Sequence, residues 1–85
     1  MARLKIRTVG DGQHPSEAVV AVTTADGKTE ELIVDRRSIK DNSVKIGYPI
    51  SARGNDELLV ELPRESLRGS WRIWVRRSDV EEAAA

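Results

Sequence analysis

The chain has 85 residues, and its 14 lysines and arginines balance its 14 aspartates and glutamates, so the formal net charge is zero. This balance argues against a dedicated duplex-DNA binder, which usually carries a basic excess. The absence of cysteine excludes disulfides, thiolate nucleophiles and cysteine-based zinc sites. No apolar run approaches the ~20 residues of a membrane span, and no apolar signal segment opens the chain, so we expect a cytoplasmic protein without membrane association.

The first expected strand covers residues 3 to 9, because apolar and charged residues alternate there. Leu4 and Ile6 point to the face that packs on the core. The opposite face carries a basic stripe made of Arg3, Lys5 and Arg7. A glycine-rich loop follows at residues 10 to 15 and contains His14, the single histidine of the chain.

A β-hairpin is expected between residues 17 and 34. The runs at residues 17 to 24 and 29 to 34 are both rich in residues that favour strands. Asp26-Gly27 lies between them, and this pair is a strong signal for a hairpin turn. Apolar residues fall on both faces of the two strands, so the pattern leaves the register of the hairpin open.

Two further strands are expected in the middle of the chain, after a charged loop at residues 35 to 43. Residues 44 to 50 alternate cleanly and put Tyr48 on the core side. Pro49 lacks an N–H donor, which places this strand at a sheet edge or beside a bulge. A turn cluster follows, and residues 57 to 62 then form the next strand.

The last expected strand covers residues 71 to 77 and holds both tryptophans. Arginines spaced four apart also suit a helix over residues 64 to 77, but Gly69 and Ser70 interrupt it. The β-prone sequence Trp-Arg-Ile-Trp-Val therefore favours a strand. Residues 81 to 85 are expected to form a flexible C-terminal tail.

These segments predict an all-β fold with a single domain over residues 1 to 80. Five or six short strands are expected to form a small antiparallel barrel or roll. The expected core collects the inward-facing residues of all strands. They are Leu4, Ile6, Val20, Val22, Leu32, Val34, Val44, Ile46, Tyr48, Leu59, Trp71, Ile73 and Val75.

The chain shows no catalytic set. His14 stands in a loop without an acid to orient it, and Ser16 beside it does not form a nucleophile elbow. The carboxylate pairs Glu30-Glu31 and Glu81-Glu82 are adjacent residues, which point to opposite faces of a strand and cannot share a metal ion. We therefore expect a non-enzymatic protein with no cofactor and no metal.

The sharpest candidate feature is Trp74, which strand alternation places between Arg72 and Arg76 on the outer face of the last strand. An outward indole beside arginines can stack on a base, hold a peptide or make cation–π contacts. Two structural alternatives are that arginine stems merely cover the indole or that Trp74 belongs to the core. If the first and last strands pair, the candidate binding face comprises Trp74, Arg72, Arg76, Arg3, Lys5 and Arg7.

Two short stretches resemble known families. The strand, short turn and last strand at the end of the chain are similar in outline to SH3-like small barrels, a group that binds peptides or RNA. Residues 59 to 65, Leu-Val-Glu-Leu-Pro-Arg-Glu, resemble the turn of the AbrB/MazE swapped-hairpin DNA-binding dimers. In that group a glycine stands a few residues before the proline, whereas Gly54 here lies nine residues before Pro63.

Two classes of function remain open from the sequence. The favoured one is a small intracellular binding module that takes a protein partner, or a second copy of itself, on the face around Trp74. The alternative is nucleic-acid binding by the same face, either to single strands or in the manner of AbrB/MazE. Because phosphate contacts release counterions, the affinity for nucleic acid is expected to fall steeply with salt.

Overall fold

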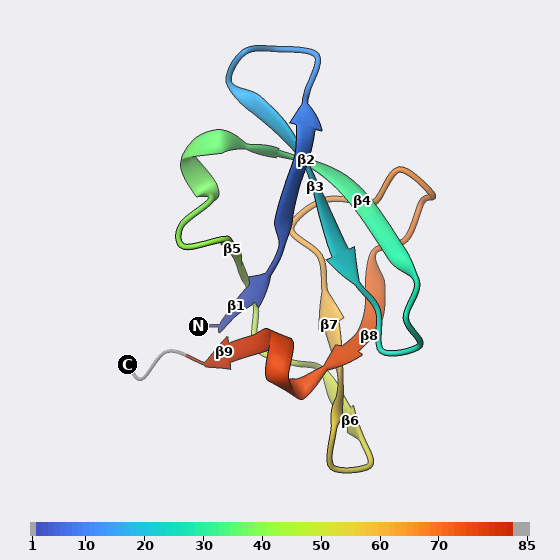
Figure 1. The fold of residues 1–85 in the computed structure, drawn as a ribbon. Coiled ribbons are helices and arrows are strands. Elements are labelled where there is room, and N and C mark those ends of the chain that lie inside the picture. Colours follow the sequence, from blue (N-terminus) through green and yellow to red (C-terminus); the bar gives the residue numbers. More distant parts are fainter. Residues whose placement is uncertain (1, 83–85) are drawn as a thin grey trace.

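The computed structural model describes residues 2 to 82, and this part of the chain contains nine short strands (Figure 1). They make three antiparallel sheets of three strands each, in the orders β5-β1-β9, β2-β3-β4 and β6-β7-β8. The fold is all-β as predicted, but its strands are shorter and more numerous than expected, and no closed barrel joins the three sheets within these residues. The strands are β1 (Ala2–Lys5), β2 (Arg7–Asp11), β3 (Glu17–Thr23), β4 (Thr29–Asp35), β5 (Ser43–Ile46), β6 (Ser51–Arg53), β7 (Glu57–Glu61), β8 (Arg72–Arg76) and β9 (Val80–Glu82). Single 3₁₀ turns, η1 (Arg36–Ser38) and η2 (Arg77–Asp79), lead into β5 and β9.

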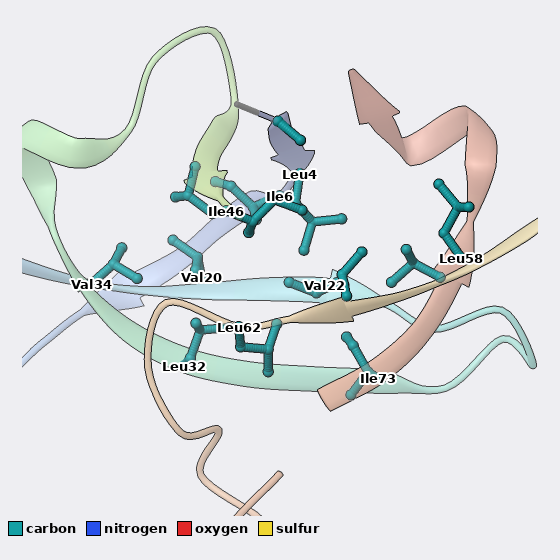
Figure 2. Packing of buried hydrophobic residues seen from close by; sticks show 14 residues of the cluster. Leu4, Ile6, Val20, Val22, Leu32, Val34, Ile46, Leu58, Leu62 and Ile73 are labelled. Atoms are coloured by element: carbon teal, nitrogen blue, oxygen red, sulfur yellow. The ribbon is translucent and has the colours of Figure 1, made fainter. Parts of the chain in front are cut away.

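The predicted first strand is shared between two sheets and divides at Ile6. Its first part, β1, pairs with β5 and β9, whereas its second part, β2, pairs with β3. The Ile6 N–H donates to the Asn42 carbonyl oxygen at 2.8 Å, so this amide is satisfied where the strand changes sheets. The buried Ile6 side chain fills the corner between the two sheets, next to Leu4 (Figure 2).

The hairpin of β3 and β4 forms around Gly27, as predicted. Gly27 has a φ of 84°, a left-handed conformation that a residue with a side chain disfavours. The register, which the sequence left open, sets Val20 opposite Leu32, and both side chains are buried. In the loop, the Ala25 N–H donates to the Trp74 carbonyl oxygen at 2.8 Å, which ties the tip of this hairpin to β8 in another sheet.

Tyr48 and Trp71, both predicted for the core, lie on the surface. The strand expected over residues 44 to 50 ends with β5, because Gly47 and Pro49 do not continue the ladder, and 65% of Tyr48 is exposed. Trp71 precedes β8 and is 53% exposed. The Leu62 N–H donates to the Trp71 carbonyl oxygen, and Pro63 after it has no N–H with which to continue the ladder, so the pairing ends at this point.

The predicted phase of β7 is wrong by one residue. Leu58 and Val60 are buried, whereas Leu59 is half-buried on the opposite face. Leu58 pairs with Val75 in the antiparallel ladder, and directly opposed residues share a face, so β8 sets the phase of β7. The apolar run at residues 58 to 60 carries no alternation of its own from which this phase could be read.

Each of the three sheets contributes side chains to one shared hydrophobic core (Figure 2). Apart from Tyr48, Leu59 and Trp71, every residue predicted for the core is buried. The half-buried Ile39 and Val80 pack against it. The core residues are Ala2, Leu4, Ile6, Val20, Val22, Leu32, Val34, Val44, Ile46, Leu58, Val60, Leu62, Ile73 and Val75.

The end of the chain returns to its beginning. Glu81 and Glu82, which the sequence assigned to a tail, belong to β9 and pair with Arg3 and Ala2 of β1. The remaining residues of the predicted tail, 83 to 85, lie outside the described residues.

A buried polar contact fixes the loop between β7 and β8. Glu30 is only 7% exposed on the core side of β4, and the buried Ser66 hydroxyl donates to its Oε1 at 2.8 Å. The same hydroxyl accepts from the Ser70 N–H at 3.0 Å. The Leu67 N–H also donates to the Glu31 carbonyl oxygen at 2.8 Å, so the loop is attached to β4 at two points.

Ser66→Ala is expected to lower the free energy of unfolding by about 1–3 kcal/mol, because it removes a hydrogen bond from a buried carboxylate. Urea denaturation measures this change. Ser51→Ala, at an exposed position of β6, serves as the matched control and should shift stability by less than about 0.5 kcal/mol. Equal effects of the two substitutions would contradict a structural role for the Ser66–Glu30 contact.

Candidate binding surfaces

Trp74 faces outward from β8, as the alternation predicted, but its ring is already occupied. The Arg53 guanidinium carbon lies 4.3 Å from the centre of the ring, a cation–π contact. Arg53 reaches across β7 from β6 and is held by Glu57, whose Oε1 accepts from Arg53 Nε at 2.8 Å. Trp74 is therefore half-buried under an arginine, and the arginine that covers it is neither Arg72 nor Arg76.

The charged groups beside Trp74 have partners within the chain. A hollow of about 330 Å³ lies next to the indole and is lined by Asp26 and Lys28, by Arg53, which pairs with Glu57, and by Glu30, which accepts from Ser66. The Thr24 hydroxyl donates a hydrogen bond to Asp26 and thereby lowers the pKa of that carboxyl; burial opposes this change, and the charge of Lys28 adds to it. Lys28 Nζ lies 3.9 Å from Asp26 Oδ2. This hollow therefore presents little unbalanced charge to a ligand.

Arg72 and Arg3 also have partners within the chain. Arg72 Nε lies 3.3 Å from Oε2 of Glu61, its cross-strand neighbour in β7. Arg3 is half-buried, and its Nε donates to the Ser43 hydroxyl at 2.7 Å. The Arg3 guanidinium also donates to the Ser43 carbonyl oxygen at 2.9 Å, so it fastens β1 to β5. Both arginines thus make structural contacts.

The remaining three candidate residues come together at one place. The strand that carries Trp74 does not pair with β1, whose neighbours are β5 and β9. Even so, Lys5 of β1, Arg7 of β2 and Arg76 of β8 line a common hollow of about 280 Å³. We name this the basic hollow. The six-residue face expected from the sequence is therefore divided, and only its Lys5, Arg7 and Arg76 part forms a concave surface.

A second surface contains two side chains that the sequence analysis had placed in the core, Tyr48 and Trp71. Tyr48, Ile50, Pro63 and Trp71 line a hollow of about 560 Å³, which we name the aromatic hollow. Ile50 is 48% exposed, beside the exposed rings of Tyr48 and Trp71. This hollow is larger than the basic hollow and the hollow beside Trp74. Lys45 and Glu61 supply charged groups among its lining residues.

Main-chain hydrogen bonds attach one wall of the aromatic hollow to β7 and the other to Leu62, the residue that follows β7. The Ile50 N–H donates to the Leu59 carbonyl oxygen at 2.8 Å on one side. The Leu62 N–H donates to the Trp71 carbonyl oxygen at 2.8 Å on the other. The backbone of Trp71 is therefore bonded directly, and that of Tyr48 lies two residues before the bonded Ile50.

Comparisons with protein-family models, with curated proteins and with solved structures returned no match for this chain. Within residues 2 to 82, no three histidine, cysteine, aspartate or glutamate side chains gather as a metal site. No helix in the described part of the chain is long and apolar enough to cross a membrane. His14 is exposed in the loop between β2 and β3.

The contact between Arg53 and Trp74 predicts a specific magnetic signature. The ring current of the indole should move the signals of the Arg53 side-chain protons upfield, as measured by NMR. Trp74→Leu should return these signals to ordinary positions, whereas Trp71→Leu should leave them unchanged because Trp71 lines a different hollow. Ordinary Arg53 shifts in the unsubstituted protein would contradict the covering of Trp74.

Proposed function

We propose that this chain is a small binding module without catalytic activity, and that its aromatic hollow takes an extended segment of a partner protein. The observation that supports this most is the exposure of Tyr48 and Trp71 beside Pro63 in one hollow of about 560 Å³. Ligand pockets usually measure roughly 300–1,000 Å³ and are lined mainly by apolar and aromatic groups with a few polar ones. The aromatic hollow has this composition.

An extended segment suits the aromatic hollow better than a helix. Segments in the polyproline II conformation dock into grooves lined by aromatic rings and carry little entropy cost, because they are already extended when free. The rings of Tyr48 and Trp71 supply such walls, and the rigid ring of Pro63 adds a third apolar surface. Lys45 and Glu61 can orient the polar main chain of the segment.

The outline shared with SH3-like barrels agrees with this proposal, since that group binds peptides or RNA. The outline covers about the last thirty residues, which include Pro63 and Trp71. The proposal itself depends on the two exposed rings, because a shared topology does not define a function.

Nucleic-acid binding by the full six-residue face receives less support. Binding of single strands relies on aromatic rings that are free to stack on bases. Arg53 already lies over Trp74, and Arg72 is paired with Glu61. Protein binding therefore remains the favoured function, now at the aromatic hollow in place of the face around Trp74.

Trp71→Ala is the test of this proposal. Peptides selected from a displayed random library for binding to the unsubstituted chain should bind the variant at least about tenfold more weakly, since a central tryptophan is a typical hot spot. Because Trp71 is half exposed, the variant should stay folded, which circular dichroism checks. Leu67→Ala is the matched control, since Leu67 is 61% exposed and lies outside the residues that line the hollow.

Selected peptides that bind the Trp71→Ala variant as tightly as the unsubstituted chain would refute the proposal. Sedimentation of the free protein gives a second reading. A dimer that dissociates on Trp71→Ala would mean that the aromatic hollow is covered by a second copy of the chain and not by a partner segment.

A further inference from the structure

The basic hollow gathers one cationic residue from each of the three sheets. Lys5 and Arg7 flank the corner at Ile6, where the chain passes from one sheet to the next, and Arg76 comes from the end of β8. The floor between them includes the small side chain of Ala21. Three cationic groups thus line one concavity of about 280 Å³.

These three cations lack the partners that others in the chain have. The ion pairs within residues 2 to 82 occupy Lys28, Arg36, Arg37, Arg53, Arg64, Arg68 and Arg72. In this described part of the chain, no carboxylate oxygen lies within 4.0 Å of a cationic nitrogen of Lys5, Arg7 or Arg76. Within these described residues, the basic hollow is therefore a place where three cations without an ion pair line one concavity.

The shape of the basic hollow is fixed before any ligand arrives. The Ile6 N–H bond to Asn42 holds the corner between Lys5 and Arg7. The Ala25 N–H bond to the Trp74 carbonyl oxygen ties β8 to the β3–β4 hairpin, two residues before Arg76. Thr23, at the end of β3, adds a hydroxyl to the lining. A ligand thus meets cations whose backbones are already positioned, which lowers the entropic cost of binding.

The charge of the lining indicates which anion fits. Among the residues that line the basic hollow, Asp79 supplies the one carboxylate against three cations, so the lining has an excess of two positive charges. Other carboxylates lie in adjoining hollows, Asp41 and Glu81 beside Lys5 and Asp56 and Glu57 beside Arg76. A phosphate monoester carries about −1.5 to −2 charges at neutral pH and offers three strong acceptor oxygens. Arginine forks bind such oxygens in a bidentate manner. A phosphodiester carries only one negative charge.

We propose that the basic hollow binds a phosphate monoester dianion, with Arg7 and Arg76 as bidentate donors and Lys5 as a third cation. The ligand is either a phosphorylated side chain or a free small phosphate. This site is separate from the aromatic hollow, since the two hollows share no lining residue. Phosphate binding here therefore does not depend on a partner segment in the aromatic hollow.

The test is an NMR titration of the full chain that follows the arginine side-chain N–H signals. The probes are a short phosphoserine peptide, inorganic phosphate, dimethyl phosphate and an eight-residue thymidine oligonucleotide. The first two should shift the signals of Arg7 and Arg76, and dimethyl phosphate should bind at least about tenfold more weakly, because it has one charge and fewer free oxygens. Tighter binding of the peptide than of phosphate would assign the source as a phosphorylated side chain, and the reverse order as a free phosphate.

Charge-matched variants separate a site from a general charge effect. Arg76→Gln and Arg7→Gln should each weaken phosphoserine binding about tenfold. Arg37→Gln removes the same charge from an exposed arginine paired with Asp35 and should change the affinity less than about twofold. Lys5→Gln gives an independent third variant if either arginine variant is unstable.

Three results would overturn the proposal. One is equal weakening by Arg37→Gln and Arg76→Gln, and another is the absence of shifts at Arg7 and Arg76 with both monoester probes. The third is an oligonucleotide that binds as tightly as the phosphoserine peptide, which would assign the basic hollow to nucleic acid. Trp71→Ala should leave phosphoserine binding unchanged, so failure of this proposal and failure of the one for the aromatic hollow can be told apart.

Discussion

The structure depends on a single apolar core that three small sheets must share. Sheets of three short strands reach stability only by packing an apolar face, and a chain of this length buries a modest share of its surface. The chain has no phenylalanine, so valine, isoleucine and leucine supply most of this core. The apolar face of each sheet is buried against the other two. Two features connect the sheets: the chain passes from one to the next at Ile6, and the tip of the β3–β4 hairpin is bonded to β8.

This arrangement places the hollows where sheets and their connections meet. The basic hollow lies between the corner of β1 and β2 on one side and the end of β8 on the other. The aromatic hollow lies where the connection from β5 to β6 faces the exit of β7. Both are therefore consequences of the topology, and their walls are held by hydrogen bonds that also hold the fold together.

Local sequence patterns predicted the structure correctly where the alternation within one strand is enough to tell its buried face from its exposed face. The alternation around Leu4 and Ile6 and the turn at Gly27 are such cases, and both are present. Leu59 was misplaced because its phase is set by the partner strand β8. Tyr48 was misplaced because alternation says nothing about where a sheet ends.

The candidate sites show the same division between local and long-range information. The outward direction of Trp74 follows from the alternation of β8, but the cover over its ring does not. Arg53 belongs to a segment whose sequence predicts a turn. It comes close to Trp74 because β7 pairs with both β6, which carries Arg53, and β8, which carries Trp74. The exposure of Tyr48 and Trp71 likewise depends on where the neighbouring strands end. No local pattern in this sequence predicts those ends.

A net charge of zero therefore describes this chain poorly. Ion pairs neutralise many of the arginines locally, whereas Lys5, Arg7 and Arg76 line one hollow together with a single carboxylate, that of Asp79. Trp71 immediately precedes β8 and Arg76 ends it, so the two are separated by about 17 Å at the usual rise per strand residue. The two hollows share no lining residue, and β8 together with the core common to the three sheets connects them.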